Sequence, residues 1–218
     1  MITNIRDFTE LISGINLFKD LQKHGQCLRA HNLGILYSVY RDPQPRTIRV
    51  ASLAGGPGLE LYALREFFSR YYPHIKVECI SLDLGEGWRP YAEELGIEFV
   101  AWDVDDGKGL KEKLGGDIDF AIVSYALYMY MSKSKTLKWL SKAILDNTIP
   151  MLFVNSRMKD LSKHISQMKS YGIVKTDLID LPGNKKDDRQ FVYHRPDLRI
   201  KKPVEKFVTM YPNVPYEK

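Results

Sequence analysis

The chain of 218 residues has the length of one domain of ordinary size and carries a formal net charge of +5. With 44% hydrophobic and 27% charged residues and no low-complexity tract, it has the composition of a globular protein, which excludes a disordered or fibrous one. No apolar run approaches the ~20 residues that span a bilayer, and residues 1–7 lack the basic and apolar regions of a secretory signal. We therefore expect an intracellular protein, cytoplasmic or nuclear, that does not insert into a membrane.

The first part of the chain has a helical pattern, because apolar side chains recur at spacings of three and four over residues 3–41. The prolines that follow, Pro43 and Pro45, end this segment before the first strand. Residues 1–45 are therefore expected to form a helical extension that either contacts a substrate or covers one face of a sheet. No linker divides the chain, so we expect one domain overall.

Strand patterns alternate with helix patterns in the core that follows, over residues 46–195, and a basic, proline-containing tail occupies residues 196–218. The expected strands are 47–53, 77–83, 97–103, 117–124, 148–155, 173–181 and 189–195. The expected helices are 59–72, 90–95, 110–114, 132–145 and 160–171. Only a loop separates the last two strands, so they must pair antiparallel. The pattern predicts an α/β fold, a doubly wound and mostly parallel sheet with helices on both faces and a C-terminal antiparallel hairpin.

The chain is organised around residues 47–64, which read as a strand, a glycine turn and the start of a helix. Such a turn gathers backbone N–H groups and a helix N-terminus at one place, and its glycines leave no Cβ between the backbone and a ligand. Asp83 and Asp103 end the next two expected strands. Because the carboxyl ends of parallel strands open onto one crevice, the three segments predict a single binding site.

Charge is distributed unevenly along the chain. Residues 1–51 carry +3, residues 52–131 carry −7 and residues 132–218 carry +9. A basic surface beside the crevice would favour an anionic partner such as nucleic acid, and an ordinary solvated surface is the alternative. Cys27 and Cys79 show neither metal-ligand nor redox spacing, so no metal site is expected, and Cys79 is expected to be a small buried residue inside a strand.

Over roughly residues 46–195 this arrangement resembles the class I S-adenosylmethionine-dependent methyltransferases, which implies a seven-stranded sheet. In that family the first strand ends in an acidic residue, an apolar one and then Gly-x-Gly-x-Gly. Here Ser52 stands at the acidic position and Ala54 at the first glycine, whereas Gly56 and Gly58 match the second and third. Glu60 either compensates for the missing acid or is a favourable partner of the helix dipole.

The resemblance implies S-adenosylmethionine as the cofactor. Asp83 then accepts hydrogen bonds from both ribose hydroxyls, and Asp103 with the backbone of Val104 faces the adenine amino group. The alternative for each aspartate is a helix cap or a turn. The implied cofactor contacts are Ser52, Leu53, Ala54, Gly55, Gly56, Pro57, Gly58, Asp83, Leu84, Asp103, Val104 and Ser124.

Two further features bear on the cofactor. Trp88 and Trp102 either stack on the adenine or belong to the core. A nicotinamide dehydrogenase is the nearest structural alternative, but its Gly-x-Gly-x-x-Gly fingerprint requires a third glycine where this chain has Leu61. The closing hairpin also fits the methyltransferases better.

The sulfonium of the cofactor activates the methyl group, so we expect direct in-line transfer without a covalent enzyme intermediate. By the same resemblance, residues 124–130 lack both the motif of adenine amine methylation and the cysteine of pyrimidine C5 methylation. Tyr125 and Tyr128 are the catalytic candidates, because they can stack a base or donate to an acceptor carbonyl, and amphipathic filler is their alternative role. The candidates for phosphate contacts are Lys133, Lys135, Lys138, Arg157, Lys185, Lys186 and Arg189.

These features together predict a methyltransferase that acts on RNA, at a base or a ribose, ahead of one that acts on a small molecule. Ser52 and Ala54 motivate a further alternative, a methyltransferase fold that has lost activity and serves as a binding subunit. Nothing in the sequence identifies a protein partner.

Overall fold

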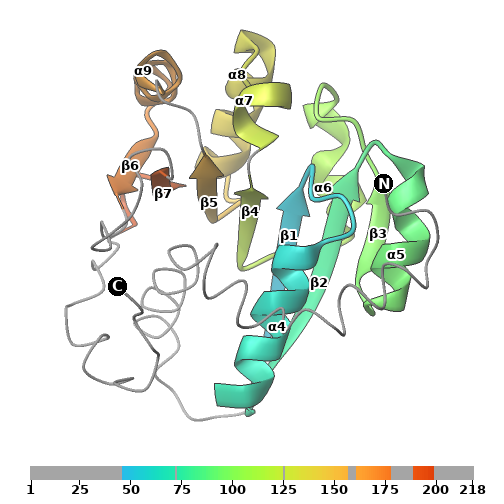
Figure 1. Cartoon of the computed structure of the whole chain (residues 1–218). Coiled ribbons are helices and arrows are strands. Elements are labelled where there is room, and N and C mark those ends of the chain that lie inside the picture. The colour runs from blue at the N-terminus through green and yellow to red at the C-terminus, as the bar shows by residue number, and fades with distance from the viewer. Residues whose placement is uncertain (1–45, 72, 125, 157–160, 178–188, 199–218) are drawn as a thin grey trace, which may run out of the picture.

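The computed structural model describes residues 46–71, 73–124, 126–156, 161–177 and 189–198 (Figure 1). The expected N-terminal extension and nearly all of the expected tail lie outside these residues. The described strands are β1 Arg46–Leu53, β2 Ile75–Asp83, β3 Glu98–Ala101, β4 Phe120–Ser124, β5 Met151–Ser156, β6 Val174–Asp177 and β7 Arg189–His194. They form one sheet in the order β3-β2-β1-β4-β5-β7-β6, which confirms the seven-stranded α/β architecture.

The sheet is parallel from β3 through β5, and β7 runs antiparallel to both of its neighbours, β5 and β6. The strand order reverses at β1, because the chain builds β2 and β3 on one side of it and returns to place β4 and β5 on the other. In open α/β sheets the crevice beyond the strand ends at such a reversal is where ligands bind.

Helices cover both faces of this sheet. The described helices are α4 Leu59–Tyr71, α5 Arg89–Glu94, α6 Leu110–Leu114, α7 Ala126–Tyr130, α8 Ser134–Leu145 and α9 Ser162–Ser170, with short 3-10 turns η1 Glu86–Trp88 and η2 Gly107–Gly109. In Figure 1, α4 crosses in front of β1 and β2, and α5 lies beside β3. None of the described helices is both long and apolar enough to cross a membrane.

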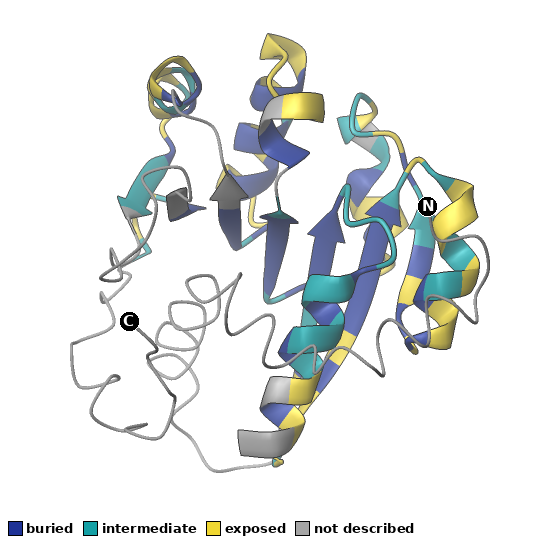
Figure 2. Cartoon of the chain, viewed as in Figure 1, coloured by how far each residue is buried: buried dark blue, intermediate teal, exposed yellow. Residues whose placement is uncertain are grey.

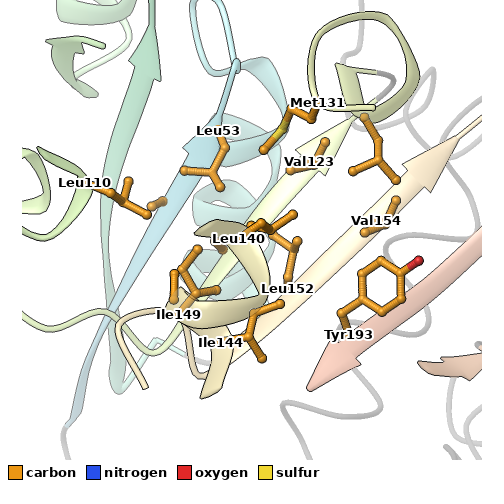
Figure 3. Close-up of a cluster of buried hydrophobic side chains, with 14 of the residues drawn as sticks. Leu53, Leu110, Val123, Met131, Leu140, Ile144, Ile149, Leu152, Val154 and Tyr193 are labelled. Carbon is orange, nitrogen blue, oxygen red and sulfur yellow. The ribbon is translucent and has the colours of Figure 1, made fainter. Parts of the chain in front are cut away.

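Two apolar clusters, one on each face, hold the layers together. The α4 and α5 side includes Leu61 and Phe68, which pack with Ile48 and Val50 of β1. The opposite cluster joins the strands to α6, α7, α8 and α9, and Figure 3 shows part of it, with Leu140 and other labelled side chains meeting over β4 and β5. The central strands are therefore buried on both sides, as their dark blue colour in Figure 2 shows.

The second strand illustrates how burial positions the crevice. At its amino end Lys76 and Glu78 are exposed and form an ion pair, so this part alternates between buried and solvent-facing residues. Towards its carboxyl end residues 79–82 are all buried, and Asp83 ends the strand half-buried. The apolar run thus carries the strand through the core and leaves its acidic last residue at the edge where the crevice opens. Cys79 is buried, as predicted, and burial raises the pKa of its thiol to about 12.

The elements differ from the sequence prediction in several places, and β5, for example, begins at Met151, three residues after the predicted start. The third strand ends at Ala101, two residues before the predicted Asp103. The fourth strand begins at Phe120, and just before it the carboxylate of Asp119 accepts a hydrogen bond from the backbone N–H of Arg49. Helix α7 was not predicted, since five residues are too few to show a helical period. The predicted strand over 173–181 is described only as far as Asp177.

Candidate functional site

The turn after β1 is a compact loop tied to β2. The backbone N–H of Ala54 donates to the carbonyl of Leu82 at 2.8 Å, and that of Gly58 donates to Gly55 at 2.9 Å. Ala54, Gly56 and Gly58 have φ values of +54°, +54° and +77°. Glycine adopts this left-handed region freely, whereas the Cβ of Ala54 makes it unfavourable there. The turn predicted from the glycines is therefore present, and Ala54 fills a position that suits glycine.

Two buried serines support the turn from below. Ser52 and Ser81 are fully buried, and Ser81 Oγ donates to the carbonyl of Gly56 at 2.8 Å. A Cβ on Gly55 would collide with Ser52 Oγ and lie 2.8 Å from Ser81 Oγ. The serines and the backbone of the turn therefore pack so closely that only glycine fits at position 55.

Asp83 joins the turn to the end of β2. Its Oδ2 accepts a hydrogen bond from the backbone N–H of Gly56 at 2.9 Å, and its Oδ1 accepts one from Gly85 at 2.8 Å. A carboxylate has about four acceptor positions, so each oxygen can still accept a second hydrogen bond. The structure thus brings Asp83 against the glycine turn at the edge of the crevice, as the sequence predicted, and its ribose contact stays a prediction.

Apolar side chains border the same place. Leu84 is 68% exposed and Trp88 is 43% exposed. The Trp88 ring is the nearest neighbour of a Cβ placed on Gly56, at 3.7 Å, so the indole lies beside the turn. Trp102, in contrast, is buried and donates from Nε1 to the carbonyl of Asp106, so its core role is confirmed.

Asp103 lies in the loop beyond β3 and is exposed. Its Oδ1 accepts a hydrogen bond from the backbone N–H of Asp105 at 2.8 Å, and the carbonyl of Val104 accepts one from Trp139 Nε1 at 3.0 Å. The backbone N–H of Trp102 donates to the carbonyl of Asp83, which keeps this loop beside the end of β2. Asp103 therefore has the turn role that the sequence left open, and its adenine contact stays a prediction.

The segment after β4 has a different character. Ser124 ends the strand half-buried, and α7 then buries Ala126 and Leu127 while Met129 and Tyr130 face solvent. Of the two predicted catalytic tyrosines, Tyr125 lies outside the described residues. Tyr128 is part of α7, but its side chain also lies outside them.

The predicted phosphate contacts are only partly described. Lys133 is bound within the protein, since its Nζ lies 2.6 Å from Asp105 Oδ2, and this hydrogen bond holds the pKa of the Asp105 carboxyl below its usual range. Lys135 and Lys138 are exposed on α8. The remaining candidates, Arg157, Lys185 and Lys186 with the side chain of Arg189, lie outside the described residues.

Two contacts at this edge were missed by sequence reasoning. Trp139 on α8 fixes the loop after β3 through its indole N–H, and it packs edge-on against Trp102 with ring centroids 5.5 Å apart. Gly107 allows that packing, because a Cβ there would collide with the Trp139 ring. No local pattern indicates either contact, since 35 residues separate Trp139 from Val104.

Comparison with known proteins adds to this geometry. No protein-family model and no curated protein matches the chain. Solved structures do match: the CurJ carbon methyltransferase has a TM-score of 0.54 at 14% identity, over 73% of this chain and 51% of that one. MnmC2 from Aquifex aeolicus has a TM-score of 0.51 at 18% identity, over 87% of this chain and 65% of that one. The chain has the class I methyltransferase fold.

A third match, the glycopeptide N-methyltransferase MtfA complexed with S-adenosyl-L-methionine, has a TM-score of 0.51 at 9% identity and covers 75% of this chain and 92% of MtfA. The chain spans about half the length of several matched structures, the CurJ methyltransferase among them. At these identities the matches establish the methyltransferase fold and no more. Within that fold, the glycine turn, Asp83 and the loop after β3 occupy the ends of three neighbouring parallel strands.

Proposed function

We propose that the protein is an S-adenosylmethionine-dependent methyltransferase. The observation that carries this proposal is the carboxylate of Asp83, which links the backbone N–H groups of Gly56 and Gly85 and keeps acceptor positions for a pair of hydroxyls. A nucleoside ribose is a ligand of that kind. MtfA, which has the same fold, is a complex with S-adenosyl-L-methionine, and this supports the choice of cofactor.

The surrounding residues fit the other parts of this cofactor. The adenine suits the exposed apolar side chains of Leu84 and Trp88 beside the turn. The cofactor carboxylate suits the N-terminus of α4, a helix of 13 residues whose first backbone N–H groups follow the glycine turn. Gly56 leaves no Cβ between the backbone and the ligand. The described residues therefore supply partners for the ribose, the base and the carboxylate.

When bound, the cofactor supplies an activated methyl group on a sulfonium, which needs no covalent help from the protein. The protein's part is to place an acceptor in line with the methyl–sulfur bond and to exclude water. Strand β4 lies next to β1 in the sheet and α7 follows it, so Ser124 and the exposed Tyr130 would belong to the wall that faces the acceptor. Direct in-line transfer is the mechanism we propose.

For the acceptor we propose RNA, methylated at a base or a ribose. Residues 132–218 carry a net charge of +9, and Lys135 and Lys138 are exposed on α8, which follows α7. Exposed aromatic and basic side chains together are typical of single-stranded nucleic acid binding, because bases stack on the former and phosphates pair with the latter. Tyr130 is the described aromatic residue in this position.

Two experiments test the proposal in sequence. Calorimetry with S-adenosylmethionine tests the cofactor, and no measurable binding would remove the methyltransferase proposal and leave the alternative of a non-catalytic binding subunit. Transfer of a labelled methyl group to fractionated cell extract then identifies the acceptor. Label that ribonuclease removes and protease does not would support RNA, whereas label in low-molecular-weight material would replace it with a small molecule.

The lysines offer a sharper test of RNA binding. Replacing Lys135 and Lys138 with alanine should lower the slope of log affinity against log salt by about 1.4, since each lost contact to single-stranded phosphate removes about 0.7. The matched control replaces Lys111 and Lys113, two exposed lysines on α6, and removes the same charge elsewhere. Equal losses in both double variants would mean that α8 has no specific role.

A further inference from the structure

The carboxylate of Glu60 on α4 lies beside Ser52, the position on β1 where the family motif has an acidic residue. Ser52 stands at the acidic position of the methyltransferase motif, and its buried Oγ donates a hydrogen bond to Oε1 of Glu60. Glu60 is the second residue of α4, so the turn between Leu53 and Leu59 folds it back over the end of β1. The side chains of strand and helix therefore meet beneath the glycine turn.

The surroundings of Glu60 favour a positive ligand. The described groups that act on its charge are Ser52, its own backbone N–H, Asp83 and Cys79, and none of these is basic. Burial, with a smaller contribution from the negative charge of Asp83, raises the pKa of the Glu60 carboxyl above its ordinary value. A carboxylate in such a place is stable only with a proton or a cation beside it.

The two carboxylates at the turn are not equivalent. Asp83 already holds one backbone N–H on each oxygen, from Gly56 and Gly85. Ser52 engages only Oε1 of Glu60. Among the described residues, Glu60 therefore receives one side-chain hydrogen bond, from Ser52, besides the contact with its own backbone N–H, and it keeps acceptor positions for a further partner.

We propose that Glu60, held in position by Ser52, binds the ammonium group of the cofactor's methionine part. This inference rests on the proposed function and adds to it the group that pairs with the cofactor's amine. In the family motif the negative charge lies at the end of β1, whereas in this chain it lies in the first turn of α4. The Ser52 hydroxyl, at the end of β1, binds the carboxylate that carries this charge. Gly55 permits the arrangement, because a side chain at that position would displace Ser52 Oγ.

The test compares three ligands on the full chain by calorimetry. S-adenosylmethionine and S-adenosylhomocysteine both carry the ammonium, and 5′-methylthioadenosine has the same nucleoside without it. The Glu60→Gln variant should bind the first two about 10- to 100-fold more weakly, because it loses a charge-assisted contact, and should bind methylthioadenosine as before. Glu66→Gln, an exposed change on the same helix, is the matched control and should leave all three affinities within about twofold.

Other outcomes would overturn the assignment. Equal loss for all three ligands in Glu60→Gln would give Glu60 a structural role in the turn, and no loss would remove it from the site. Loss for S-adenosylmethionine alone would place the carboxylate at the sulfonium instead. If the unaltered chain bound neither S-adenosylmethionine nor methylthioadenosine, the proposed function itself would fail, which is a distinguishable result.

A second variant separates charge from shape. Ser52→Asp combined with Glu60→Gln returns the acid to the strand and should recover most of the affinity for S-adenosylmethionine. Binding of methylthioadenosine shows whether this double variant keeps the nucleoside site intact. A double variant that binds methylthioadenosine normally and S-adenosylmethionine no better than Glu60→Gln would contradict the proposal.

Discussion

The two sides of the crevice are built in different ways. At the ends of β1 and β2, the buried hydroxyls of Ser52 and Ser81 and the carboxylate of Asp83 all bind within the protein. Beyond β4, Met129 and Tyr130 face solvent on a helix of five residues. The first side is shaped by backbone and buried hydrogen bonds, whereas the second presents side chains that can change without disturbing the sheet.

The contrast extends into the interior. On the α9 and β7 side, His164 is buried and its Nδ1 lies 3.1 Å from the hydroxyl of Tyr193, while its Nε2 has no partner among the described residues. The buried polar groups at the ends of β1 and β2 each have a hydrogen-bond partner, whereas His164 has one on only one of its two ring nitrogens. We therefore expect the ends of β1 and β2 to respond most to changes of shape, and the side of α9 and β7 to respond most to changes of pH.

The largest effect should come from adding a single methyl group to the glycine turn. Gly55→Ala places a Cβ against Ser52 Oγ and 2.8 Å from Ser81 Oγ, both fully buried. Overpacking of this kind should cost about 3 kcal/mol of unfolding free energy and abolish cofactor binding, measured by denaturant titration and calorimetry. Gly87→Ala is the control, because nothing lies within 4 Å of its Cβ, and a similar loss there would remove the steric explanation.

Acid should destabilise the α9 and β7 side through His164. Burial lowers the pKa of His164 to about 4, from 6.5 in the unfolded chain, so only the unfolded state takes up the proton between these values. The unfolding free energy should therefore fall by about 3 kcal/mol as the pH drops from 6.5 to 4. Burial also lowers the pKa of His194. Protonation of the unfolded state at this residue therefore adds to the fall in unfolding free energy as the pH drops below the ordinary pKa of histidine.

The measurement is the unfolding free energy at several pH values in the unaltered chain and in His164→Gln. The variant should show a shallower fall, since it has no proton to take up at this position. The half-buried His74, replaced in the same way, is the control. An unchanged slope in His164→Gln would assign the acid sensitivity to other groups.

Removal of the carboxylate at the end of β2 should weaken cofactor binding. Asp83→Ala should reduce the affinity for S-adenosylmethionine by about 1–3 kcal/mol, because charge-assisted hydrogen bonds to the ribose and to the turn are lost. Asp83→Asn keeps the shape of the side chain and tests the charge separately. Calorimetry that finds the same affinity in Asp83→Ala would show that the ribose lies elsewhere.

The smallest effect should be a gain. Ala54 has a φ of +54°, where a Cβ is unfavourable and glycine is not. Ala54→Gly should raise the unfolding free energy by about 1 kcal/mol without weakening cofactor binding, as seen in denaturant titration. A loss of stability would mean that Ala54, half-buried against the core, contributes more by packing than it costs in backbone strain.

Much of the fold could be predicted because it depends on local patterns. The apolar run of β4 predicts a buried strand, and the spacing of apolar residues between the strands predicts helices. The link before Arg189 is too short for a parallel crossover, so the last two strands must be antiparallel. The position of β7 between β5 and β6 could not be predicted, since the pairing of Met151 with His194 joins residues far apart in the chain. Helix α7 was missed because it is too short to show a period.

The sequence by itself determined where the candidate site lies. A turn rich in glycine has few backbone solutions, and an aspartate that ends a buried strand must emerge at the sheet edge, as Gly56 and Asp83 do. Only the tertiary structure decided which groups meet there. The contacts of Glu60 with Ser52 and of Lys133 with Asp105 join different elements, and their formation depends on how the helices pack on the sheet. Residue types set the chemistry that is available, and packing selects the partners.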